Sequence, residues 1–580
     1  MTTPFGTRSA VGPVEELEPG DFRVEREVWP DELPREPAFP YGKRPVHEHV
    51  RLRAEEAPDA PALTFCGRTL TRAELDRAVD AFARTLAARG YGPGDVLALY
   101  LQNCPQFYVA YHGANRAGLV VAPLNPQVRD IALEHLLSDS GADILVTHTD
   151  GLDVVESVED TLDLDSVLVA SYRDWADLDA AAVPVHPVVT DEAPVPAGRE
   201  QFVGAVDAGR SSDASLPEVG MADLALYQYT GGTSGMPKGC RHTHWNVFFK
   251  AVAGAQGVLQ TEGQGTQLAV MPIFHVAGKR GAVDQPAIDG THVVLQPRYD
   301  PERMLAAIDA HNATSTWLTV PMAEELVGHD RVDDYDLTSL SARRDVTVCT
   351  AWGTTLTEEL SERWAELTGA RLHTGGYGLS ETHTGDSQMA EHSRVDSAFV
   401  GQPTYGVEVE IRDFETGEQL PTGEVGEIVV RTPSTMLGYL GRPDRTAEVL
   451  DDDGWLRTGD RGQVTDEGFF YFHGRQKDVV KVSGHTVAPR EVQQALERSG
   501  LVADSVVVGK PHDTRGHVLE AHVLPAEKGV TADDIHGWTA DHLAEYKRPK
   551  SVVFRESFPR TDIGKVDRVA YYEELPDDYA

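Results

Sequence analysis

Between residues 71 and 146, apolar patterns typical of helices alternate with apolar patterns typical of strands. Thr71 and Glu74 form a capping box, and the apolar residues after them recur at helical spacing until Gly90. Further helices are expected from about Pro105 and over residues 131–137. Short apolar runs with the length of buried strands separate them: residues 96–101, 119–122 and 144–146. Strands and helices in this order form a parallel sheet covered on both faces, so we expect an α/β fold with doubly wound sheets.

The rest of the chain predicts a second, smaller domain. A chain of 580 residues exceeds what one hydrophobic core holds. Residues 1–40 read as a polar, proline-rich arm. Residues 151–222 have weak periodicity, and we expect that segment to be peripheral. A charged, glycine-bearing joint at 474–477 precedes a stretch with helix and strand signals of its own. We therefore expect a large N-terminal domain over 1–474 and a small, mobile α+β domain over 475–580.

The charge balance excludes several classes of partner. Lys and Arg number 52 against 92 Asp and Glu, which gives a net charge of −40 and a chain that repels nucleic acid and anionic membranes. No apolar run approaches the ~20 residues that cross a bilayer, and the N-terminus has no apolar signal core. The four cysteines are widely separated and form no metal-ligand or redox pair. A reducing cytoplasm fits best.

Lysine is scarce in this chain. Only 11 residues are lysine, and none lies between Lys43 and Lys238. A strongly acidic, lysine-poor surface resembles that of proteins from high-salt cytoplasms, where counterions screen self-repulsion. We expect a halophilic enzyme; the alternative is an ordinary acidic one. Because lysine is rare here, each lysine beside a motif is a candidate functional residue.

A glycine- and hydroxyl-rich loop follows the apolar run 224–226 and reads Tyr229-Thr-Gly-Gly-Thr-Ser-Gly-Met-Pro-Lys238-Gly239. Backbone N–H groups, hydroxyls and a cation gathered in this way suit a polyphosphate. The lysine follows proline and precedes glycine, so this is not the common nucleotide loop. The alternative, a glycine-rich surface turn, is disfavoured by the rare lysine at its end. The residues expected at the phosphates are Thr230, Gly231, Gly232, Thr233, Ser234, Gly235 and Lys238.

This loop resembles the signature of the adenylate-forming (AMP-binding) superfamily, which includes acyl-CoA synthetases, adenylation domains of peptide synthetases and luciferases. Further motifs resemble those of the superfamily in the same order: Pro272 to Gly278, Gly376-Tyr-Gly-Leu-Ser-Glu381, Gly423 to Glu427, Gly454 to Asp460, Gly474 to Asp478 and Pro559 to Lys565. The resemblance spans about residues 40–575 and is of the acyl-CoA synthetase, or fatty-acid–CoA ligase, type. It implies the fold of these enzymes, a large domain with a small mobile one.

The resemblance also assigns the nucleotide site. Glu381 and the Thr230 hydroxyl would hold Mg²⁺, which prefers oxygen ligands. Tyr377 would lie against adenine, and Asp460 and Arg475 would bind the ribose. The remaining residues assigned to ATP or AMP are Gly353, Gly376, Ser380, Lys477, Lys481 and Lys565. The segment around Gly353 reads Trp-Gly-Thr-Thr, which departs from the usual Gly-Gly-Ala-Pro.

For catalysis, the resemblance implies two half-reactions. A carboxylate attacks ATP to give acyl-AMP and pyrophosphate; the small domain then rotates about Lys477, and the thiol of coenzyme A displaces AMP. Lys565 would bridge the α-phosphate and the attacking carboxylate, with Lys238 and Glu381 at the phosphates and His275 over the acyl carboxylate. The coenzyme A channel would be lined by Ser483, Gly484 and His485.

The acid is expected to be a medium- or long-chain fatty acid, because the stretch 101–107 resembles fatty-acyl members of the superfamily. Alternatives are an aromatic or dicarboxylic acid, transfer to a separate carrier protein, and a non-catalytic nucleotide sensor. Lys279 and Arg280 stand where apolar residues facing the acyl chain are expected. Two interpretations stay open, with solvated cations on a helix favoured over groups that face the substrate and select a polar acid.

Overall fold

The structure is a computed structural model that describes residues 17–26, 29–31, 33–230, 237–256, 265–342, 345–349, 356–388, 395–396, 398–476, 480–482, 485–487, 489–512, 516–543, 545–560, 566–576 and 579. Its largest sheet has seven strands in the order β7-β6-β5-β3-β4-β8-β9. Their bounds are β3 Val96–Tyr100, β4 Val120–Pro123, β5 Ile144–His148, β6 Ser166–Ala170, β7 Glu200–Gln201, β8 Leu224–Tyr229 and β9 Gly239–Thr243. β3 pairs in parallel with β4 and β5, which confirms the predicted parallel sheet, and only β9 runs antiparallel to its neighbour.

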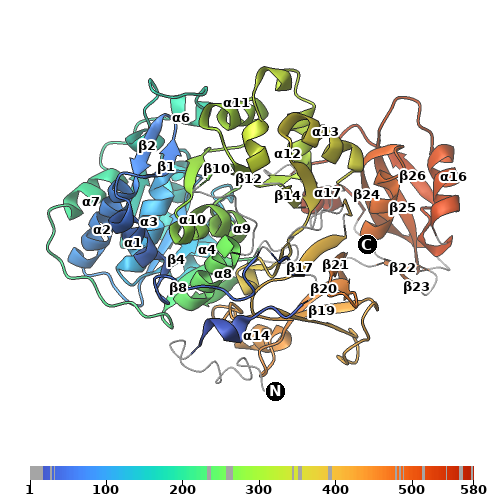
Figure 1. Cartoon of the computed structure of the whole chain (residues 1–580), viewed down its shortest axis with the longest axis horizontal. Helices are drawn as coiled ribbons and strands as arrows, with labels where there is room; N and C mark the ends of the chain where they lie inside the picture. The colour runs from blue at the N-terminus through green and yellow to red at the C-terminus, as the bar shows by residue number, and fades with distance from the viewer. Residues whose placement is uncertain are drawn as a thin grey trace.

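Helices cover both faces of this sheet (Figure 1). Alternate residues of β3 point to opposite sides: Leu97 and Leu99 join one buried cluster, and Val96, Ala98 and Tyr100 join another. On the first side pack α2 (Arg72–Ala88), α3 (Pro105–Arg116) and α7 (Phe202–Gly209). On the second side pack α4 (Asp130–Ser140) and α5 (Leu152–Val158). The expected doubly wound arrangement is confirmed, as is the capping box of Thr71 and Glu74 at the start of α2.

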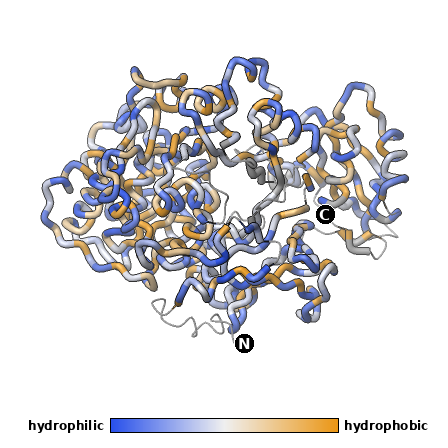
Figure 2. Tube along the Cα trace, in the orientation of Figure 1, coloured by the Kyte–Doolittle hydropathy of each residue, from blue (hydrophilic) through white to orange (hydrophobic). Residues whose placement is uncertain are grey.

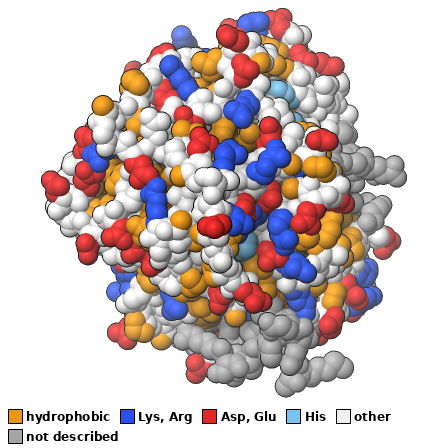
Figure 3. Space-filling view, turned by 90° about the vertical axis from the view of Figure 1, so that its left-hand side faces the viewer, with side chains coloured by type: hydrophobic (Ala, Val, Ile, Leu, Met, Phe, Trp, Pro, Cys, Tyr) orange, Lys and Arg blue, Asp and Glu red, His pale blue; other side chains and the backbone are white. Residues whose placement is uncertain are grey.

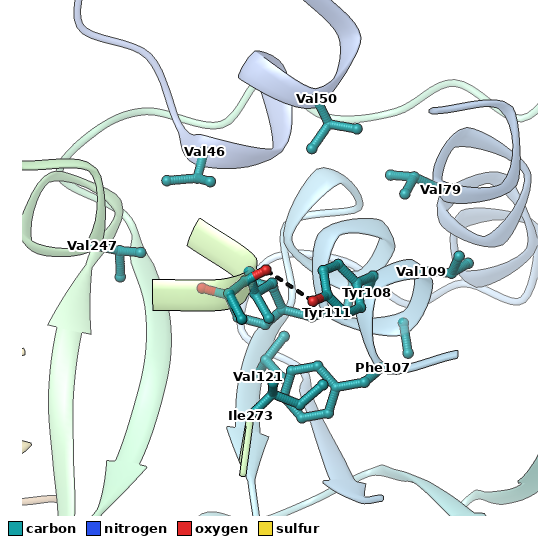
Figure 4. Packing of buried hydrophobic residues seen from close by; sticks show 14 of the residues in the cluster. Val46, Val50, Val79, Phe107, Tyr108, Val109, Tyr111, Val121, Val247 and Ile273 are labelled. Atoms are coloured by element: carbon teal, nitrogen blue, oxygen red, sulfur yellow. Dashed lines mark hydrogen bonds between the residues drawn. The ribbon is translucent and has the colours of Figure 1, made fainter. Parts of the chain in front are cut away.

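The first cluster extends to the N-terminal helix α1 (Val46–Glu56). Figure 4 shows Phe107, Tyr108 and Tyr111 of α3 packed among side chains of neighbouring elements. The hydroxyl of Tyr108 donates to the carbonyl of Ala282 at 2.8 Å, which satisfies the one polar atom of this buried ring. Hydrophobic stretches recur along the inner elements, and the outermost turns are hydrophilic (Figure 2).

A second, five-stranded sheet has the order β12-β10-β11-β1-β2. Its strands are β1 Pro61–Phe65, β2 Arg68–Thr71, β10 Thr266–Ala269, β11 His292–Leu295 and β12 Ser315–Thr316. A small parallel sheet follows with β13 Leu318–Thr319, β14 Asp345–Cys349 and β15 Arg371–Thr374. The helices of this region are α6 Pro187–Thr190, α8 His244–Gln256, α9 Val276–Lys279, α10 Gln285–Asp289, α11 Pro301–His311, α12 Val320–Val327 and α13 Glu358–Thr368. A π-helical segment, η6 (Arg280–Asp284), joins α9 to α10.

The fourth sheet of the large domain pairs β16-β17-β21-β20-β19-β18 in antiparallel fashion. Its strands are β16 Ser387–Gln388, β17 Phe399–Pro403, β18 Glu408–Arg412, β19 Gly426–Arg431, β20 Leu456–Val464 and β21 Phe470–Arg475, with α14 Pro443–Val449 beside them. This mixture of parallel and antiparallel sheets gives the large domain its α/β architecture.

The C-terminal part has its own sheet and buried clusters, at the right of Figure 1. Its strands are β22 Val480–Val482, β23 His485–Val487, β24 Val502–His512, β25 Gly516–Pro525 and β26 Ser551–Phe554. Its helices are α15 Pro489–Glu497, α16 Ala532–His542 and α17 Arg568–Glu573. The chain thus has a large N-terminal and a smaller C-terminal domain; the boundary at 474/475 and the mobility of the small domain stay predictions.

Two expectations, the polar N-terminal arm and the peripheral position of residues 151–222, need correction. The residues of the supposed polar arm that the structure describes include a deeply buried apolar set: Leu17, Phe22, Val24, Trp29 and Leu33. Phe22, for example, lies 4.6 Å from Phe249 of α8 between ring centroids. Residues 166–170, within the stretch expected to be peripheral, form β6 inside the main sheet. The N-terminal arm places isolated apolar residues among proline and charged residues, so no helical or strand period reveals their burial. Residues 167–170, in contrast, form a continuous apolar run, a local strand signal that the weak periodicity of the surrounding segment obscured.

The acidic surface leads to a prediction about salt. Figure 3 shows one face on which acidic groups are spread from edge to edge with Lys and Arg side chains between them. With a net charge of −40, the folded chain repels itself, and the Debye length falls to ~3 Å only near 1 M salt. We expect the melting temperature to rise markedly between low and molar KCl, measured by circular dichroism. A melting temperature that does not move would contradict the halophilic interpretation.

None of the helices in the part of the chain that the structure describes combines the length and apolarity needed to cross a bilayer.

Candidate active site

The glycine-rich loop is closed at its neck by two hydrogen bonds. Tyr229 pairs with Gly239 across β8 and β9. Beyond this pair, the Thr230 N–H donates to the Lys238 carbonyl at 3.0 Å, and the Lys238 N–H donates to the Thr230 Oγ1 at 3.2 Å. The loop residues Gly231, Gly232, Thr233, Ser234 and Gly235 lie outside the described residues. The neck lies at the carboxyl end of β8, which is where α/β sheets bind ligands.

Tyr439 connects this neck to Glu381. The Lys238 ammonium lies 4.4 Å from the centroid of the Tyr439 ring, and the Tyr439 hydroxyl donates to the Glu381 Oε1 at 2.7 Å. Burial and the Glu381 carboxylate raise the pKa of Tyr439, so the phenol keeps its proton and stays a donor. The two predicted phosphate and metal residues are therefore brought together by a residue that sequence reasoning missed. In the sequence, the only hint of Tyr439 is its position as an aromatic residue directly after a glycine. That glycine, Gly438, has a φ of 133°, which allows a sharp turn.

Glu381 fits a magnesium ion bound mainly through its nucleotide. The side chain is half-buried, and within the described residues only Tyr439 hydrogen-bonds its carboxylate. No set of three or more His, Cys, Asp or Glu side chains in the described part of the chain could hold a metal by itself. Magnesium accepts such a site because it takes its other oxygens from phosphates and water. Glu381, with Thr230 as the second predicted ligand, would hold such an ion.

Two predicted nucleoside residues lie together on the fourth sheet, and a third, Tyr377, packs against it. Asp460 of β20 and Arg475 of β21 are cross-strand partners, with Asp460 Oδ1 3.3 Å from Arg475 Nε. The Tyr377 hydroxyl donates to Asp460 Oδ2 at 2.7 Å, and its ring packs against Phe470 and Phe472 at 5.1 and 5.8 Å between centroids. Burial and Asp460 raise the pKa of Tyr377, so this phenol also stays protonated. Asp460 is only 2% exposed.

The segment after Glu381 turns sharply. Ser380 to Thr382 form one turn of 3-10 helix, and the three residues after it are left-handed: His383, Thr384 and Gly385 have φ of 58°, 55° and 69°. This conformation is strained for a β-branched residue such as Thr384. Gly378 permits the turn to pack closely, because a Cβ there would lie 2.4 Å from the Gly385 nitrogen. The Ser380 carbonyl accepts from His242 Nε2 at 2.8 Å.

Two buried ion pairs hold this strained turn. Lys250 of α8 lies 2.6 Å from Asp386, which directly follows the turn, and neither side chain has any exposed area. Asp386 also accepts from the Thr382 hydroxyl. From the other side, the Asp284 Oδ2 lies 3.3 Å from His383 Nε2 and 2.6 Å from the Lys279 ammonium. The turn behind Glu381 is thus fixed at both ends by charged contacts in the protein interior.

Lys279 is therefore not a solvated cation, and the favoured interpretation of this lysine is wrong. Its side chain has no exposed area; its ammonium pairs with Asp284 and lies 3.1 Å from the Tyr111 hydroxyl. Burial alone would raise the pKa of Asp284, but the Lys279 ammonium and His383 lower it to about 2. Burial and the nearby Lys279 lower the pKa of His383 to about 4, so this imidazole is neutral at pH 7. Arg280 is half-buried.

The structure places the other predicted residues as follows. His275 is exposed and caps α9, with its Nδ1 accepting from the Ala277 N–H at 3.4 Å. The Gly376 N–H donates to the Val400 carbonyl at 3.1 Å, beside Tyr377. Lys481 and His485 lie on the adjacent strands β22 and β23. Four further predictions fall outside the described residues: Gly353, Lys477, the pair Ser483 and Gly484, and Lys565.

The chain is similar to known proteins over most of its length. The family model "AMP-binding enzyme" matches residues 50–440, and "AMP-binding enzyme C-terminal domain" matches residues 491–565. The chain is 30% identical to a long-chain-fatty-acid–CoA ligase of Bacillus subtilis over 94% of this chain and 97% of that protein. It is 32% identical to a feruloyl-CoA synthase of Amycolatopsis over 89% and 96% of the two chains.

Among solved structures, ATP-bound MatB from Rhodopseudomonas palustris is similar, with a TM-score of 0.77, 25% identity, and coverage of 92% of this chain and 99% of that one. The matched family models span both domains, and the first covers the loop neck, Glu381 and Tyr439. The chain therefore belongs to the AMP-binding enzyme family and has the adenylate-forming fold.

Proposed function

We propose that this protein activates a carboxylic acid with ATP as an acyl-adenylate and transfers the acyl group to the thiol of coenzyme A. The observation that carries the proposal is the link from Lys238 through Tyr439 to Glu381 at the carboxyl end of β8. It joins a cation and a carboxylate, the two groups that a nucleoside triphosphate with its metal requires, and it lies in a chain of the matching family.

In the first half-reaction, a carboxylate oxygen of the acid forms a bond to the α-phosphorus of ATP, and the bond to pyrophosphate breaks. Two anions approach each other in this step, so the site must spread and neutralise negative charge. Lys238, at the loop neck, supplies a cation for the phosphates. Lys565 is proposed to bridge the α-phosphate and the attacking carboxylate. Magnesium, when held by Glu381 and Thr230, would neutralise further phosphate charge.

The nucleoside end would be held on the fourth sheet. Asp460 and Arg475 lie side by side there and offer an acceptor and a donor for ribose hydroxyls. Tyr377 fixes the Asp460 carboxylate through its own hydroxyl, so its ring is proposed to lie beside the adenine. Gly376 and Ser380 flank this ring along the chain. Lys477 and Lys481 are proposed to bind the same nucleotide.

In the second half-reaction, the coenzyme A thiol attacks the acyl carbonyl, and AMP leaves with its phosphate. The small domain would rotate about Lys477 to bring Ser483, Gly484 and His485 to the pantetheine chain. A glycine at 484 suits a narrow channel because it has no side chain. Most of the lysines lie in the C-terminal part, from Lys477 onward, where they would meet the phosphates of coenzyme A.

The acid is proposed to have a medium or long carbon chain. The long-chain-fatty-acid–CoA ligase of Bacillus subtilis supports this class. The feruloyl-CoA synthase of Amycolatopsis, at similar identity, supports an aromatic acid as the second candidate. Transfer to a separate carrier protein remains an alternative to coenzyme A, and a cytoplasmic location is part of the proposal.

The test is carboxylate-dependent exchange of labelled pyrophosphate into ATP, followed by acyl-CoA formation on addition of coenzyme A. Fatty acids of increasing length, aromatic acids and diacids are compared in molar KCl. We expect exchange with at least one acid class and formation of acyl-CoA and AMP together. Tight ATP binding with no exchange for any acid would instead indicate a nucleotide sensor.

A further inference from the structure

A cluster of buried and half-buried charges beside the candidate active site carries one more positive than negative charge. It contains Lys250, Lys279 and Arg280 as cations and Asp284 and Asp386 as carboxylates. Lys250 is paired with Asp386 and Lys279 with Asp284, each at 2.6 Å. Burial keeps the neighbouring imidazoles of His112, His242 and His383 neutral, and it keeps the Tyr111 phenol beside Lys279 protonated. Within the described residues, Arg280 is left without a carboxylate at ion-pair distance.

The guanidinium of Arg280 is placed between two backbone segments. A Cβ added to Gly254 of α8 would lie 2.3 Å from its Nη1, and a Cβ added to Gly385 would lie 3.0 Å from its Cζ. Its Nε is buried and has no hydrogen-bond partner among the described residues. Burial lowers the pKa of Arg280, which expresses the cost of holding this charge without a partner. A guanidinium that neighbouring backbone holds in place, and that has an N–H without a hydrogen-bond partner, is suited to bind a carboxylate.

Chain connections link Arg280 to the groups proposed to act on the acid. His275, proposed to lie over the acyl carboxylate, caps the helix that continues to Arg280. Five helical residues rise about 7.5 Å. Gly385, which contacts the guanidinium, follows Glu381 by four residues. An acid whose reacting carboxylate lies at His275 can therefore reach Arg280 with its other end if its chain is of medium length.

We propose that Arg280 binds a second acidic group at the far end of the acid, so that the substrate is a medium-chain dicarboxylic acid rather than an unsubstituted fatty acid. The inference rests on the proposed function and narrows its substrate class. Lys279 and Lys250 do not serve this role, because Asp284 and Asp386 already neutralise them. The second carboxylate of the acid would supply the anion that the cluster lacks.

The experiment compares acids of equal carbon number in the pyrophosphate exchange assay at fixed KCl: octanoate with octanedioate, and dodecanoate with dodecanedioate. We expect the wild-type protein to have the higher kcat/KM for the diacid of at least one pair, with the ω-hydroxy acid between the two. Arg280→Met should lower the diacid-to-monoacid ratio by about 10–100-fold, the range for a hydrogen bond between charged groups. Arg280→Lys should recover part of the preference.

Arg363→Met is the matched control, because Arg363 lies on the exposed surface of α13. The diacid-to-monoacid ratio of kcat/KM in this variant should equal that of the wild type. The inference is overturned if the wild type prefers the monoacid, or if Arg280→Met leaves the diacid-to-monoacid ratio unchanged. In either case, pyrophosphate exchange itself would still support activation of an acid. Inorganic phosphate that raises monoacid exchange to the diacid level also overturns it, since any free anion would then fill the site. Absence of exchange with every acid instead refutes the proposed function. The wild-type ratio decides the question even if Arg280→Met fails to fold.

Discussion

Lys565→Ala is expected to nearly abolish carboxylate-dependent pyrophosphate exchange while leaving thioester formation from acyl-AMP intact. Lys565 is proposed to act only when carboxylate and ATP meet, because two anions converge on its ammonium group only in that step. Removing a preorganised charge at such a place typically costs about 10²–10³-fold in rate. The measurement pairs the exchange assay with a second assay that supplies synthetic acyl-AMP and coenzyme A.

Lys477→Pro provides the converse variant. A fixed φ at the proposed joint should hinder rotation of the small domain, so thioester formation slows while exchange persists. Equal damage to both half-reactions in Lys565→Ala would mean that the lysine is structural or that the domain does not alternate. The proposed division of labour between the two half-reactions would then be wrong.

Lys250→Met is expected to cost about 3–5 kcal/mol of folding free energy, the range for removing one partner of a buried ion pair. The substitution leaves the Asp386 carboxylate buried without its ammonium and releases the strained turn that Thr384 and Gly385 form behind Glu381. Urea unfolding followed by circular dichroism in molar KCl measures the loss. Because the turn also positions Glu381, the magnesium concentration for half-maximal exchange should rise in the same variant.

Lys528→Met is the control, since Lys528 is exposed and the substitution should change the free energy of unfolding by no more than about 0.5 kcal/mol. Asp386→Asn alone should also destabilise the protein, whereas Lys250→Met with Asp386→Asn should cost less than the sum of the single changes. Additive costs, or a Lys250→Met variant as stable as the control, would show that the pair does not hold the turn.

The first sheet could be predicted because its signals are local. Thr71 and Glu74 cap α2 through contacts three residues apart, and the apolar runs of β3, β4 and β5 are continuous in sequence. The apolar arm residue Phe22 could not be predicted, because it packs on α8 more than two hundred residues away with no period around it. Helices and strands with local sequence signals could therefore be predicted, whereas residues buried only by long-range packing could not.

Some residues of the candidate site could likewise be predicted from sequence motifs, and others only from the structure. The superfamily motifs named Lys238, Glu381, Asp460 and Arg475, and the structure brings the last two to neighbouring strands. Tyr439, which joins Lys238 to Glu381, belongs to none of the motifs that sequence reasoning used. The pairing of Lys250 with Asp386 spans 136 residues, so no spacing rule reveals it. The burial of Lys279 could not be predicted, because its partner Asp284 lies on a π-helical turn, where the α-helical period no longer applies.

The central claim, activation of the acid by adenylation, is tested most directly with an acid labelled with ¹⁸O in its carboxylate. In the proposed reaction, one carboxylate oxygen becomes the bridge to the α-phosphorus, and it stays with AMP when the thiol attacks the acyl carbonyl. Mass spectrometry should therefore find one ¹⁸O in each AMP formed and none in pyrophosphate. Labelled inorganic phosphate together with ADP would show an acyl-phosphate route, and unlabelled AMP would show that the acid never bonds to the α-phosphorus; either result would contradict the account.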